Sequence, residues 1–512
     1  MLEKNRLLLI GLDGATWDVL NPLLEENKLP NLKRIKENGI SGVLESNFPP
    51  ITGSAWMTIA TGKEPGETGI FDFLNIVDRK SWQIKAVSSF DYRNNGSIWD
   101  FLSAKGKKVG VVNYPMLYPP YEVNGVLISG LGADEKGDIF YPKNLKQKLK
   151  SKLGPHKIYT SFGRPRYKNP ENFISDLSKL IEYNHRLADF LLNDTYDFFF
   201  FVISATDFLQ HYAWNWWTNK NSKYHEVFIR LWQKIDDVVG SMLKKWGNNN
   251  VMVVSDHGMG ELKDRFLINR WLQEEGYLFL KGKKGGYHNY LRGVKYYLRE
   301  GFNLFAEIFP TLGDALFWKI LRKKVKKFYF PSQNIDFEKS KAFALKHSGL
   351  GNIYINIEDE NGREYLRLRD EIKNRLKAFL KSVGLKSEIY SKDELYKGDK
   401  INKLPDLIFM IEDNMTEVIS AVEHNKMFIS PKINNKTGSH RIEGIYIAKG
   451  PNIEKVRDIL NGKCKLKDIF PACCVIMGEG SPKEFATNQQ RNSYEQSEND
   501  KIIEKLEGLG YM

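Results

Sequence analysis

The chain has 512 residues, of which 42% are hydrophobic and 13% aromatic, and this content can bury a sizeable interior. An intrinsically disordered protein is therefore excluded, and the length predicts several domains, or one domain with large insertions. The formal charge of +13 favours an anionic partner, which could be a phosphorylated metabolite, nucleic acid or an acidic membrane surface.

The cysteines and the apolar runs indicate the cellular setting. The three cysteines lie between residues 464 and 474 and form neither a disulfide framework nor a spaced thiolate metal site. The apolar run 7–12 follows a few polar residues, without the long apolar region and cleavage site of a signal peptide. Later apolar runs, such as 196–204, are far shorter than the ~20 residues that span a bilayer. We therefore expect a cytoplasmic protein.

The first half of the chain alternates β-rich runs with longer helical patterns. The first strand, 6–13, leads into a helix expected from about 16 to 38, for which Gly39 fits a C-terminal cap. Asn169 and Pro170 fit the cap and the first position of a later helix. Further strands are expected at 107–115, 123–131, 196–204 and 250–256. Apolar strands separated by amphipathic helices predict an α/β fold with a doubly wound, mostly parallel central sheet and helices on both faces.

After Gly260 the sequence becomes aromatic, basic and helical, and we interpret residues 260–340 as an inserted cap or subdomain. Strand and helix signals resume at 349–357, 364–383, 404–411 and 443–451, and we expect these strands to complete the sheet. The predicted core is thus discontinuous, with residues 1–259 and 341–480. Residues 481–512 are expected to form a linker and a C-terminal helix.

Acidic and imidazole side chains occur where the predicted strands end, which is the edge where open parallel sheets bind ligands. Asp207 and His211 are four residues apart, so on a helix both would project from one face and could hold one cation. Singly, each candidate also fits an ordinary turn, cap or surface position. Carboxylate and imidazole are ligands of Zn²⁺ and Mn²⁺, and six of them suffice for two metal sites that remain open to substrate. The six candidates are Asp13, Asp207, His211, Asp256, His257 and His440.

Thr52 lies in the stretch "FPPITGSAWMTIATG", where a pair of prolines gives way to a helix-forming segment. A side chain at such a junction faces the first N–H groups of the helix, which favour negative charge. Thr52 is therefore either a helix cap or a nucleophile that faces an anion.

Five motifs together resemble a known family. "LIGLDG", "PPITGSAWMTIATG", "TDFLQH", "SDHGMG" and "GSHRIEGIYIAKGP" occur in the order and approximate spacing of the alkaline phosphatase superfamily. The resemblance is closest to its type I phosphodiesterase/nucleotide pyrophosphatase branch, and within it to the predicted prokaryotic phosphohydrolase/phosphomutase group. The stretches "VVNYPMLYPPYEVNGVLISGL", "INRWLQEEGYL" and "EKLEGLGYM" extend the resemblance over nearly the whole chain.

The resemblance implies an alkaline phosphatase-like core that hydrolyses phosphoric esters, as a phosphodiesterase or phosphatase, with two divalent metal ions. Zn²⁺ is the expected metal, with Mn²⁺ as the alternative. The alternatives in function are phosphotransfer or phosphomutase activity at the same site, or a scaffold that binds anions without turnover. The implied roles are Thr52 as a nucleophile that forms a covalent phosphothreonine, Asp13, Asp256 and His257 at one metal, and Asp207, His211 and His440 at the other.

Two departures from the family pattern concern the substrate. Nucleotide pyrophosphatases usually carry a His where this chain has Thr68, and a phosphate-binding Asn where it has Phe73, with Asn75 nearby. These departures weigh against nucleotide hydrolysis, while Asn75 and His347 are candidate substrate contacts; a loop position is the alternative for His347. The chain also lacks the Cys-x-Pro-x-Arg motif of the formylglycine sulfatases.

Basic residues of the insertion, including Arg322, Lys323 and Lys324, could bind an anionic leaving group or form a solvated helix face. An apolar, basic insertion would also suit peripheral membrane contact and a lipid-linked substrate. We therefore expect a phosphorylated small-molecule or lipid-linked substrate. Nucleic acid is not the expected partner, because no recognised base-reading motif accompanies the charge.

Overall fold

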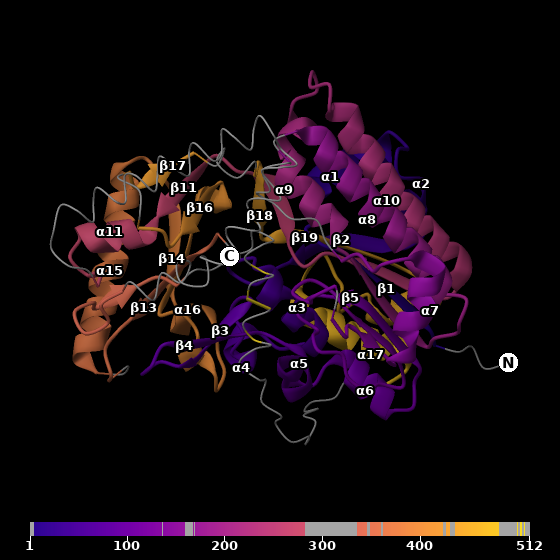
Figure 1. The fold of residues 1–512 in the computed structure, drawn as a ribbon, viewed down its shortest axis with the longest axis horizontal. Helices are drawn as coiled ribbons and strands as arrows, with labels where there is room; N and C mark the ends of the chain where they lie inside the picture. Colours follow the sequence, from indigo (N-terminus) through magenta and orange to yellow (C-terminus); the bar gives the residue numbers. More distant parts are fainter. Residues whose placement is uncertain are drawn as a thin grey trace.

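The computed structural model describes two β-sheets that lie side by side, each with its own helices (Figure 1). The described residues are 5–135, 137–158, 167, 169–281, 335–345, 349–359, 362–422, 426–430, 436–480, 499, 502, 503 and 506.

The larger sheet has nine strands, and its centre is parallel. β1 (Leu7–Leu12) is fully buried and lies between β8 (Phe198–Ile203) and β9 (Asn250–Val254), both parallel to it. The strand order is β20-β2-β19-β9-β1-β8-β5-β6-β7. The remaining strands are β2 (Ile40–Glu45), β5 (Val109–Tyr114), β6 (Gly125–Ser129), β7 (Phe140–Tyr141), β19 (Glu443–Lys449) and β20 (Lys463–Lys465).

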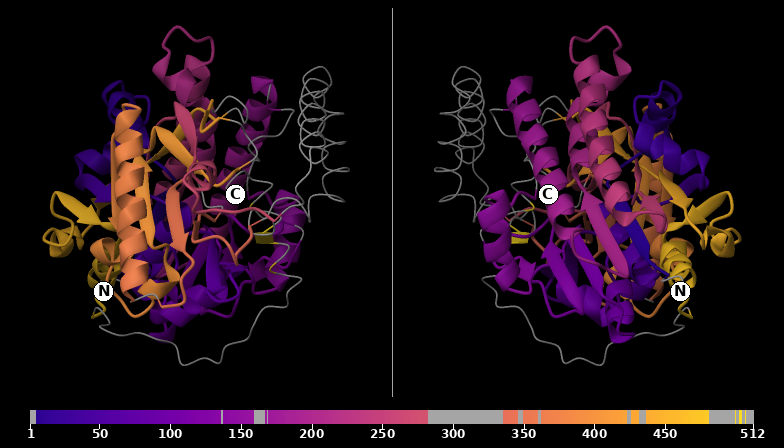
Figure 2. Two further views of the ribbon diagram at one scale, coloured as in Figure 1. Left: turned by 90° about the vertical axis from the view of Figure 1, so that its left-hand side faces the viewer. Right: turned by 90° about the vertical axis from the view of Figure 1, so that its right-hand side faces the viewer.

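Helices cover both faces of this sheet, which confirms the doubly wound α/β fold. One group packs around α10, and Figure 2 shows α8 and α10 running alongside each other. The other group packs around the buried helix α3 (Thr52–Thr61). The first group is α1 (Trp17–Glu25), α2 (Pro30–Glu37), α7 (Asn144–Leu153), α8 (Pro170–Leu191), α9 (Ala205–Thr218) and α10 (His225–Trp246). The second adds α4 (Pro65–Thr68), α5 (Ser89–Asn95), α6 (Ile98–Ala104) and α17 (Ile469–Met477).

A second sheet is formed by later segments of the chain, in the order β12-β13-β15-β16-β11-β17, with β14 also paired to β15. The long helix α15 (Arg363–Ser382) packs on β13 and β14, and α11 (Ile268–Glu274) packs on β12 and β16. The strands are β11 (Asp264–Leu267), β12 (Ala342–Phe343), β13 (Gly351–Ile355), β14 (Ser387–Ser391), β15 (Leu407–Ile411), β16 (Thr416–Ile419) and β17 (Phe428–Ile429). The short helix α16 (Lys392–Leu395) follows β14.

The late strands therefore differ from the sequence-based expectation. The run 443–451 does join the first sheet as β19, but 349–357 and 404–411 supply β13 and β15 of the second sheet. An apolar strand pattern identifies a strand without identifying its partner, so the two sheets could not be told apart. Most of the expected insertion, 260–340, lies outside the described residues, and its described start contributes the strand β11 to the second sheet and the helix α11 that packs on it.

Two pairs of strands stand apart from the sheets. β10 (Gly258–Glu261) pairs antiparallel with β18 (Gly438–Arg441), with Met259 opposite His440. β3 (Leu74–Asp78) pairs with β4 (Gln83–Ala86). In the described part of the chain, no helix combines the length and the apolar run that crossing a membrane requires.

The expected helix 16–38 is two helices, α1 and α2, broken at residues 26–29, where Asn27 has a positive φ of 55°. The strand β2, which follows directly, was not expected. Gly39 does not take the left-handed conformation of a cap. A Cβ at Gly39 would lie 2.1 Å from the carbonyl oxygen of Ala448, so glycine is needed there for the close approach of β19. Asn169 caps α8 as predicted, since its side chain accepts a hydrogen bond from Glu171 N–H.

Candidate metal centre

The central parallel strands bring four of the candidate side chains to one edge of the large sheet. Asp13 directly follows β1, and Asp207 lies in the first turn of α9, just after β8. Asp256 and His257 follow β9. Because β9, β1 and β8 are adjacent and parallel, their carboxyl ends place these side chains in one crevice.

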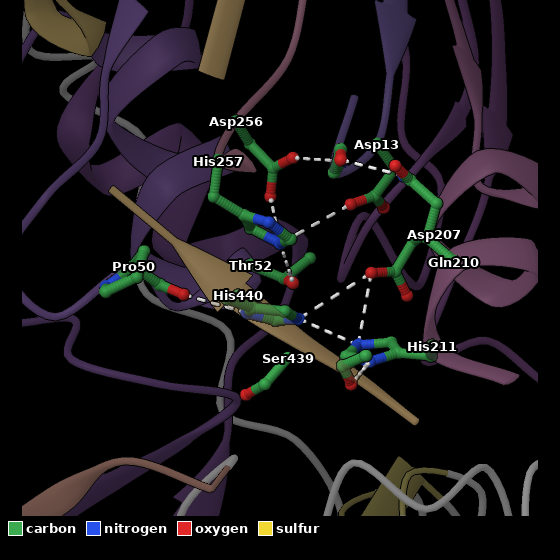
Figure 3. A network of polar contacts seen from close by, with 12 residues as sticks. Asp13, Pro50, Thr52, Asp207, Gln210, His211, Asp256, His257, Ser439 and His440 are labelled. Carbon is green, nitrogen blue, oxygen red and sulfur yellow. Dashed lines mark hydrogen bonds and ion pairs between the residues drawn. The ribbon is translucent and has the colours of Figure 1, made fainter. Parts of the chain in front are cut away.

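The antiparallel pair β10–β18 brings in His440. β10 begins directly after His257, and its pairing with β18 places His440 so that its imidazole stacks on that of His257, with ring centroids 3.6 Å apart. His211 approaches from α9, and its Nε2 lies 2.8 Å from Nε2 of His440. Residues separated by more than 400 positions thus converge, as Figure 3 shows.

The first group of potential ligands is Asp13, Asp256 and His257, whose ligand atoms lie within 4.8 Å of one another. His257 Nε2 lies 3.7 Å from Asp13 Oδ1 and 3.3 Å from Asp256 Oδ2. All three side chains are fully buried. Asp256 is oriented by Gly14, whose N–H donates to Asp256 Oδ1 over 3.1 Å.

The second group lies beside the first. Asp207 Oδ1 is 3.2 Å from His211 Nε2 and 3.6 Å from His440 Nε2. Ligand atoms of Asp207, His257 and His440 also lie within 4.8 Å of one another. The six candidates named from the sequence therefore lie close together around one crevice.

The histidine tautomers support cation binding. Each Nδ1 faces a backbone carbonyl, which can only accept, so each Nδ1 carries the proton and each Nε2 presents a lone pair to the crevice. Lone pairs of His211 and His440 that face each other at 2.8 Å repel unless a cation or proton lies between them. The carbonyls belong to Gly438 for His211, Gly258 for His257 and Pro50 for His440, at 2.8, 2.9 and 2.8 Å.

The pKa shifts of the buried carboxyl and imidazole groups also favour a bound cation. Burial raises the pKa of Asp13 well above its usual range, and the carboxylates of Asp256 and Asp207 raise it further. Burial raises the pKa of Asp256 to about 8. Burial likewise lowers the pKa of His257 and of His211, so neither imidazole readily takes a proton to neutralise the carboxylates.

Unsatisfied buried oxygens test whether metal ions fit. Both carboxylate oxygens of Asp13, and Oδ2 of Asp256, are buried and accept no hydrogen bond among the described residues. A buried carboxylate without partners is costly unless a cation pairs with it. The oxygen and nitrogen donors of this crevice match those of Zn²⁺ and Mn²⁺, so the residues present fit two divalent ions.

Thr52 lies against this centre. It is the first residue of α3 and fully buried, and Ile51 rather than Thr52 occupies the N-cap position. Its Oγ1 lies 3.1 Å from His257 Nε2. The hydroxyl makes no capping bond, so capping does not explain its placement, whereas the crevice does. The N–H groups of the first turn of α3 face the same region.

The remaining candidates are less informative. Asn75 lies in β3, is buried, and pairs in register with Lys85 of β4. His347 and the insertion residues 322–324 lie outside the described residues. Thr437 was not among the residues named from the sequence; its N–H and its hydroxyl donate hydrogen bonds to carbonyls of the helix that carries His211. The only sequence signal for Thr437 was the position of its hydroxyl three residues before the candidate ligand His440.

This chain resembles a known protein family in sequence and solved structures in fold. The family model of type I phosphodiesterase/nucleotide pyrophosphatase matches residues 7–441. A search of curated proteins found no match. Among solved structures, phosphonoacetate hydrolase from Sinorhizobium meliloti, in complex with phosphonoformate, is 15% identical with a TM-score of 0.51, and the alignment covers 92% of this chain and 95% of that one. Murine ectonucleotide pyrophosphatase/phosphodiesterase 5, an inactive variant in complex with AMP, is 15% identical with a TM-score of 0.51, covering 94% and 97%. The human protein of the same name is 12% identical, with a TM-score of 0.51 and the same coverage.

Proposed function

This chain belongs to the type I phosphodiesterase/nucleotide pyrophosphatase family and is a phosphoester hydrolase, and we propose that it cleaves its substrate through Thr52 beside two divalent metal ions. The observation that carries this proposal is the convergence of six buried carboxylate and imidazole groups around the Thr52 hydroxyl. A scaffold without turnover would have no need of a buried hydroxyl aimed at such a crevice.

The proposal divides the ligands between two ions, Zn²⁺ first and Mn²⁺ as the alternative. Bound there, the ions would stabilise an alkoxide and neutralise the phosphoryl group. The division is supported by the ligand atoms of Asp13, Asp256 and His257, which lie within 4.8 Å of one another, and by Asp207 Oδ1, which lies 3.2 Å from His211 Nε2 and 3.6 Å from His440 Nε2. One ion would be held by Asp13, Asp256 and His257, and the other by Asp207, His211 and His440.

Thr52 would act as the nucleophile. Its hydroxyl gives up its proton to solvent, and Oγ1 forms a bond to phosphorus as the bond from phosphorus to the leaving-group oxygen breaks. The covalent product is a phosphothreonine, and attack by water frees Oγ1 with net retention at phosphorus. Because Thr52 opens α3, the N–H groups of that first turn stabilise the negative charge on the phosphoryl oxygens.

The substrate class is proposed from the site and from the neighbours. The bound molecules in the related structures, phosphonoformate and AMP, are small anions that contain phosphorus. With Thr68 and Phe73 at the positions noted above, we favour a phosphorylated small molecule or a lipid-linked phosphoester over a nucleotide. Peripheral contact with an acidic membrane, a cytoplasmic location and a role for Asn75 in substrate binding remain predictions.

The test compares three proteins loaded with Zn²⁺ or Mn²⁺ on bis(4-nitrophenyl) phosphate and 4-nitrophenyl phosphate. Thr52→Ala should lower kcat by at least about a thousandfold while retaining the metal, because it removes the nucleophile and no ligand. Thr61→Val is the matched control, since Thr61 ends the same helix and its hydroxyl donates to Met57 O over 2.7 Å. Full activity of Thr52→Ala would overturn the proposal.

Added glycerol separates hydrolysis from transfer. Release of inorganic phosphate from the monoester, with no glycerol phosphate formed, supports the hydrolase. Glycerol phosphate as the main product would instead establish the phosphotransferase that the sequence left as an alternative. Wild-type protein that binds neither metal after reconstitution would contradict the metal-dependent mechanism.

A further inference from the structure

Helix α9 is kinked next to a candidate metal ligand. Within α9 (Ala205–Thr218), Ala213 has non-helical angles, φ −120° and ψ 22°. This kink lies two residues beyond His211. A kink leaves backbone carbonyls of the preceding turn in need of new donors, and those near His211 are buried.

Thr437 supplies those donors from a distant part of the chain. Its N–H donates to the carbonyl of His211 over 2.7 Å. In an unbroken helix that carbonyl would be the acceptor for Asn215 N–H. Asn215 N–H donates instead to Thr437 Oγ1 over 3.4 Å, and Thr437 Oγ1 donates to the carbonyl of Tyr212 over 2.9 Å. Thr437 thus bridges the kink with three hydrogen bonds.

The residues that follow Thr437 extend this bridge into the metal centre. The carbonyl of Gly438 accepts the Nδ1–H of His211 over 2.8 Å, and His440 lies two residues further on. A Cβ at Gly438 would lie 2.4 Å from the carbonyl oxygen of Gln210, so this position requires glycine to approach α9. One segment, 437–440, therefore fixes the orientation of one histidine and carries the other.

We infer that Thr437 is a positioning residue that sets His211 relative to His440, and thereby the geometry of one of the two metal sites. The inference rests on the proposed function, since it assumes that these histidines bind a metal. It concerns metal affinity first and catalysis only through it. Partners that orient a ligating histidine typically contribute tenfold to a hundredfold to metal affinity.

The variant Thr437→Val keeps the shape of the side chain and removes the hydroxyl. It should weaken the binding of one of the two ions about tenfold and leave the other unchanged, because the hydrogen bonds of the Thr437 hydroxyl in the described part of the chain go to α9. Thr437→Ser keeps the hydroxyl and should restore wild-type affinity within about threefold. Thr437→Ala gives a second test of the lost hydroxyl if the valine variant does not fold.

The matched control is Thr218→Val. Thr218 is exposed at the end of the same helix, and its hydroxyl donates to Trp214 O over 3.3 Å without approaching the centre. This variant removes one bond between a hydroxyl and a carbonyl of α9, as Thr437→Val does, and should bind both ions as the wild type does.

The experiment titrates zinc-loaded proteins with a chromogenic chelator and follows the two release steps, alongside thermal melting to verify folding. An earlier release of one zinc in Thr437→Val or Thr437→Ala, absent in Thr437→Ser and Thr218→Val, supports the inference. Identical titrations of the wild type and the variants without the hydroxyl would overturn it. Wild-type protein that binds no zinc would instead refute the proposed function, so the two failures are distinguishable.

Discussion

The metal-free protein should lose stability as the pH rises from 7 to 9, because Asp256 is buried with a pKa raised to about 8. A carboxyl group whose pKa is higher in the folded state binds its proton more tightly there than in the unfolded chain. Its stabilising effect is complete below the unfolded pKa near 4 and is lost as the pH rises through the folded value. In this window His257 and His211 are neutral in the folded state, because burial lowers their pKa values, and they are largely neutral in the unfolded chain, where the pKa of His is near 6.5.

The magnitude follows from that value. With a folded pKa of about 8, the proton on Asp256 contributes about 1.4 kcal/mol at pH 7 and less than about 0.1 kcal/mol at pH 9. The expected loss is therefore about 1.4 kcal/mol, or roughly 3 °C to 6 °C in melting temperature if the cooperative unit has about 150 to 250 residues. Asp13, whose pKa is also raised, changes stability in the same direction.

The assay is thermal melting of chelator-treated protein at pH 7 and pH 9, beside Asp256→Asn and the zinc-loaded wild type. Asparagine keeps the oxygen that accepts the N–H of Gly14 and cannot ionise. Metal-free Asp256→Asn should thus show a pH dependence smaller by about 1.4 kcal/mol, and the zinc-loaded wild type should also be less sensitive. Equal pH dependence of metal-free wild type and Asp256→Asn would refute the reasoning.

Two further substitutions test the frame around the site. Glu417→Gln leaves the buried Arg265 and the neighbouring Lys436 without their carboxylate. It should therefore lower the free energy of unfolding, measured by denaturation at pH 7, by about 3 kcal/mol. A loss below about 0.5 kcal/mol would contradict this. Gly39→Ala should lower the free energy of unfolding by about 1 to 3 kcal/mol in the same assay, because its Cβ would lie 2.1 Å from the carbonyl oxygen of Ala448. A variant as stable as the wild type would show that β19 can shift without cost.

The parts of the fold that sequence predicted are those encoded locally. The strands that precede Asp13 and Asp256 were recognisable from their apolar runs, and packing alone does not explain the polar pair Asp256 and His257 after the second run. Parallel strands share a carboxyl edge, so the meeting of these residues followed from the fold class. The cap of α8 at Asn169 was predictable for the same local reason.

The parts that sequence did not predict depend on contacts between distant segments. β13 and β15 carry the same apolar pattern as strands of the first sheet, and only tertiary pairing assigns them to the second. The bond between Thr437 and the kink of α9 joins residues more than 200 positions apart, and no local signal marks the kink at Ala213. Glycine at position 39 served a contact rather than a turn, which a single sequence does not reveal.

Buried carboxylates with a structural role in this protein are matched by cations from the chain itself. Asp406 is fully buried, and Arg79 and Lys392, against the effect of burial, hold its pKa below the ordinary value. Its remaining hydrogen bonds come from Tyr365 OH over 2.7 Å and Ile355 N–H over 2.7 Å. The carboxylate is thereby satisfied without any ligand.

Asp13 and Asp256 differ from Asp406 in the charges that surround them. They are equally buried, but among the described residues no lysine or arginine pairs with either of them, and their pKa values are raised instead of lowered. At neutral pH such buried groups are tolerated either with a proton bound, as the raised pKa values indicate, or with a positive charge from outside the chain. Asp406 is therefore paired within the chain, whereas Asp13 and Asp256 have the surroundings expected of the proposed cation ligands, and this contrast does not depend on any family resemblance.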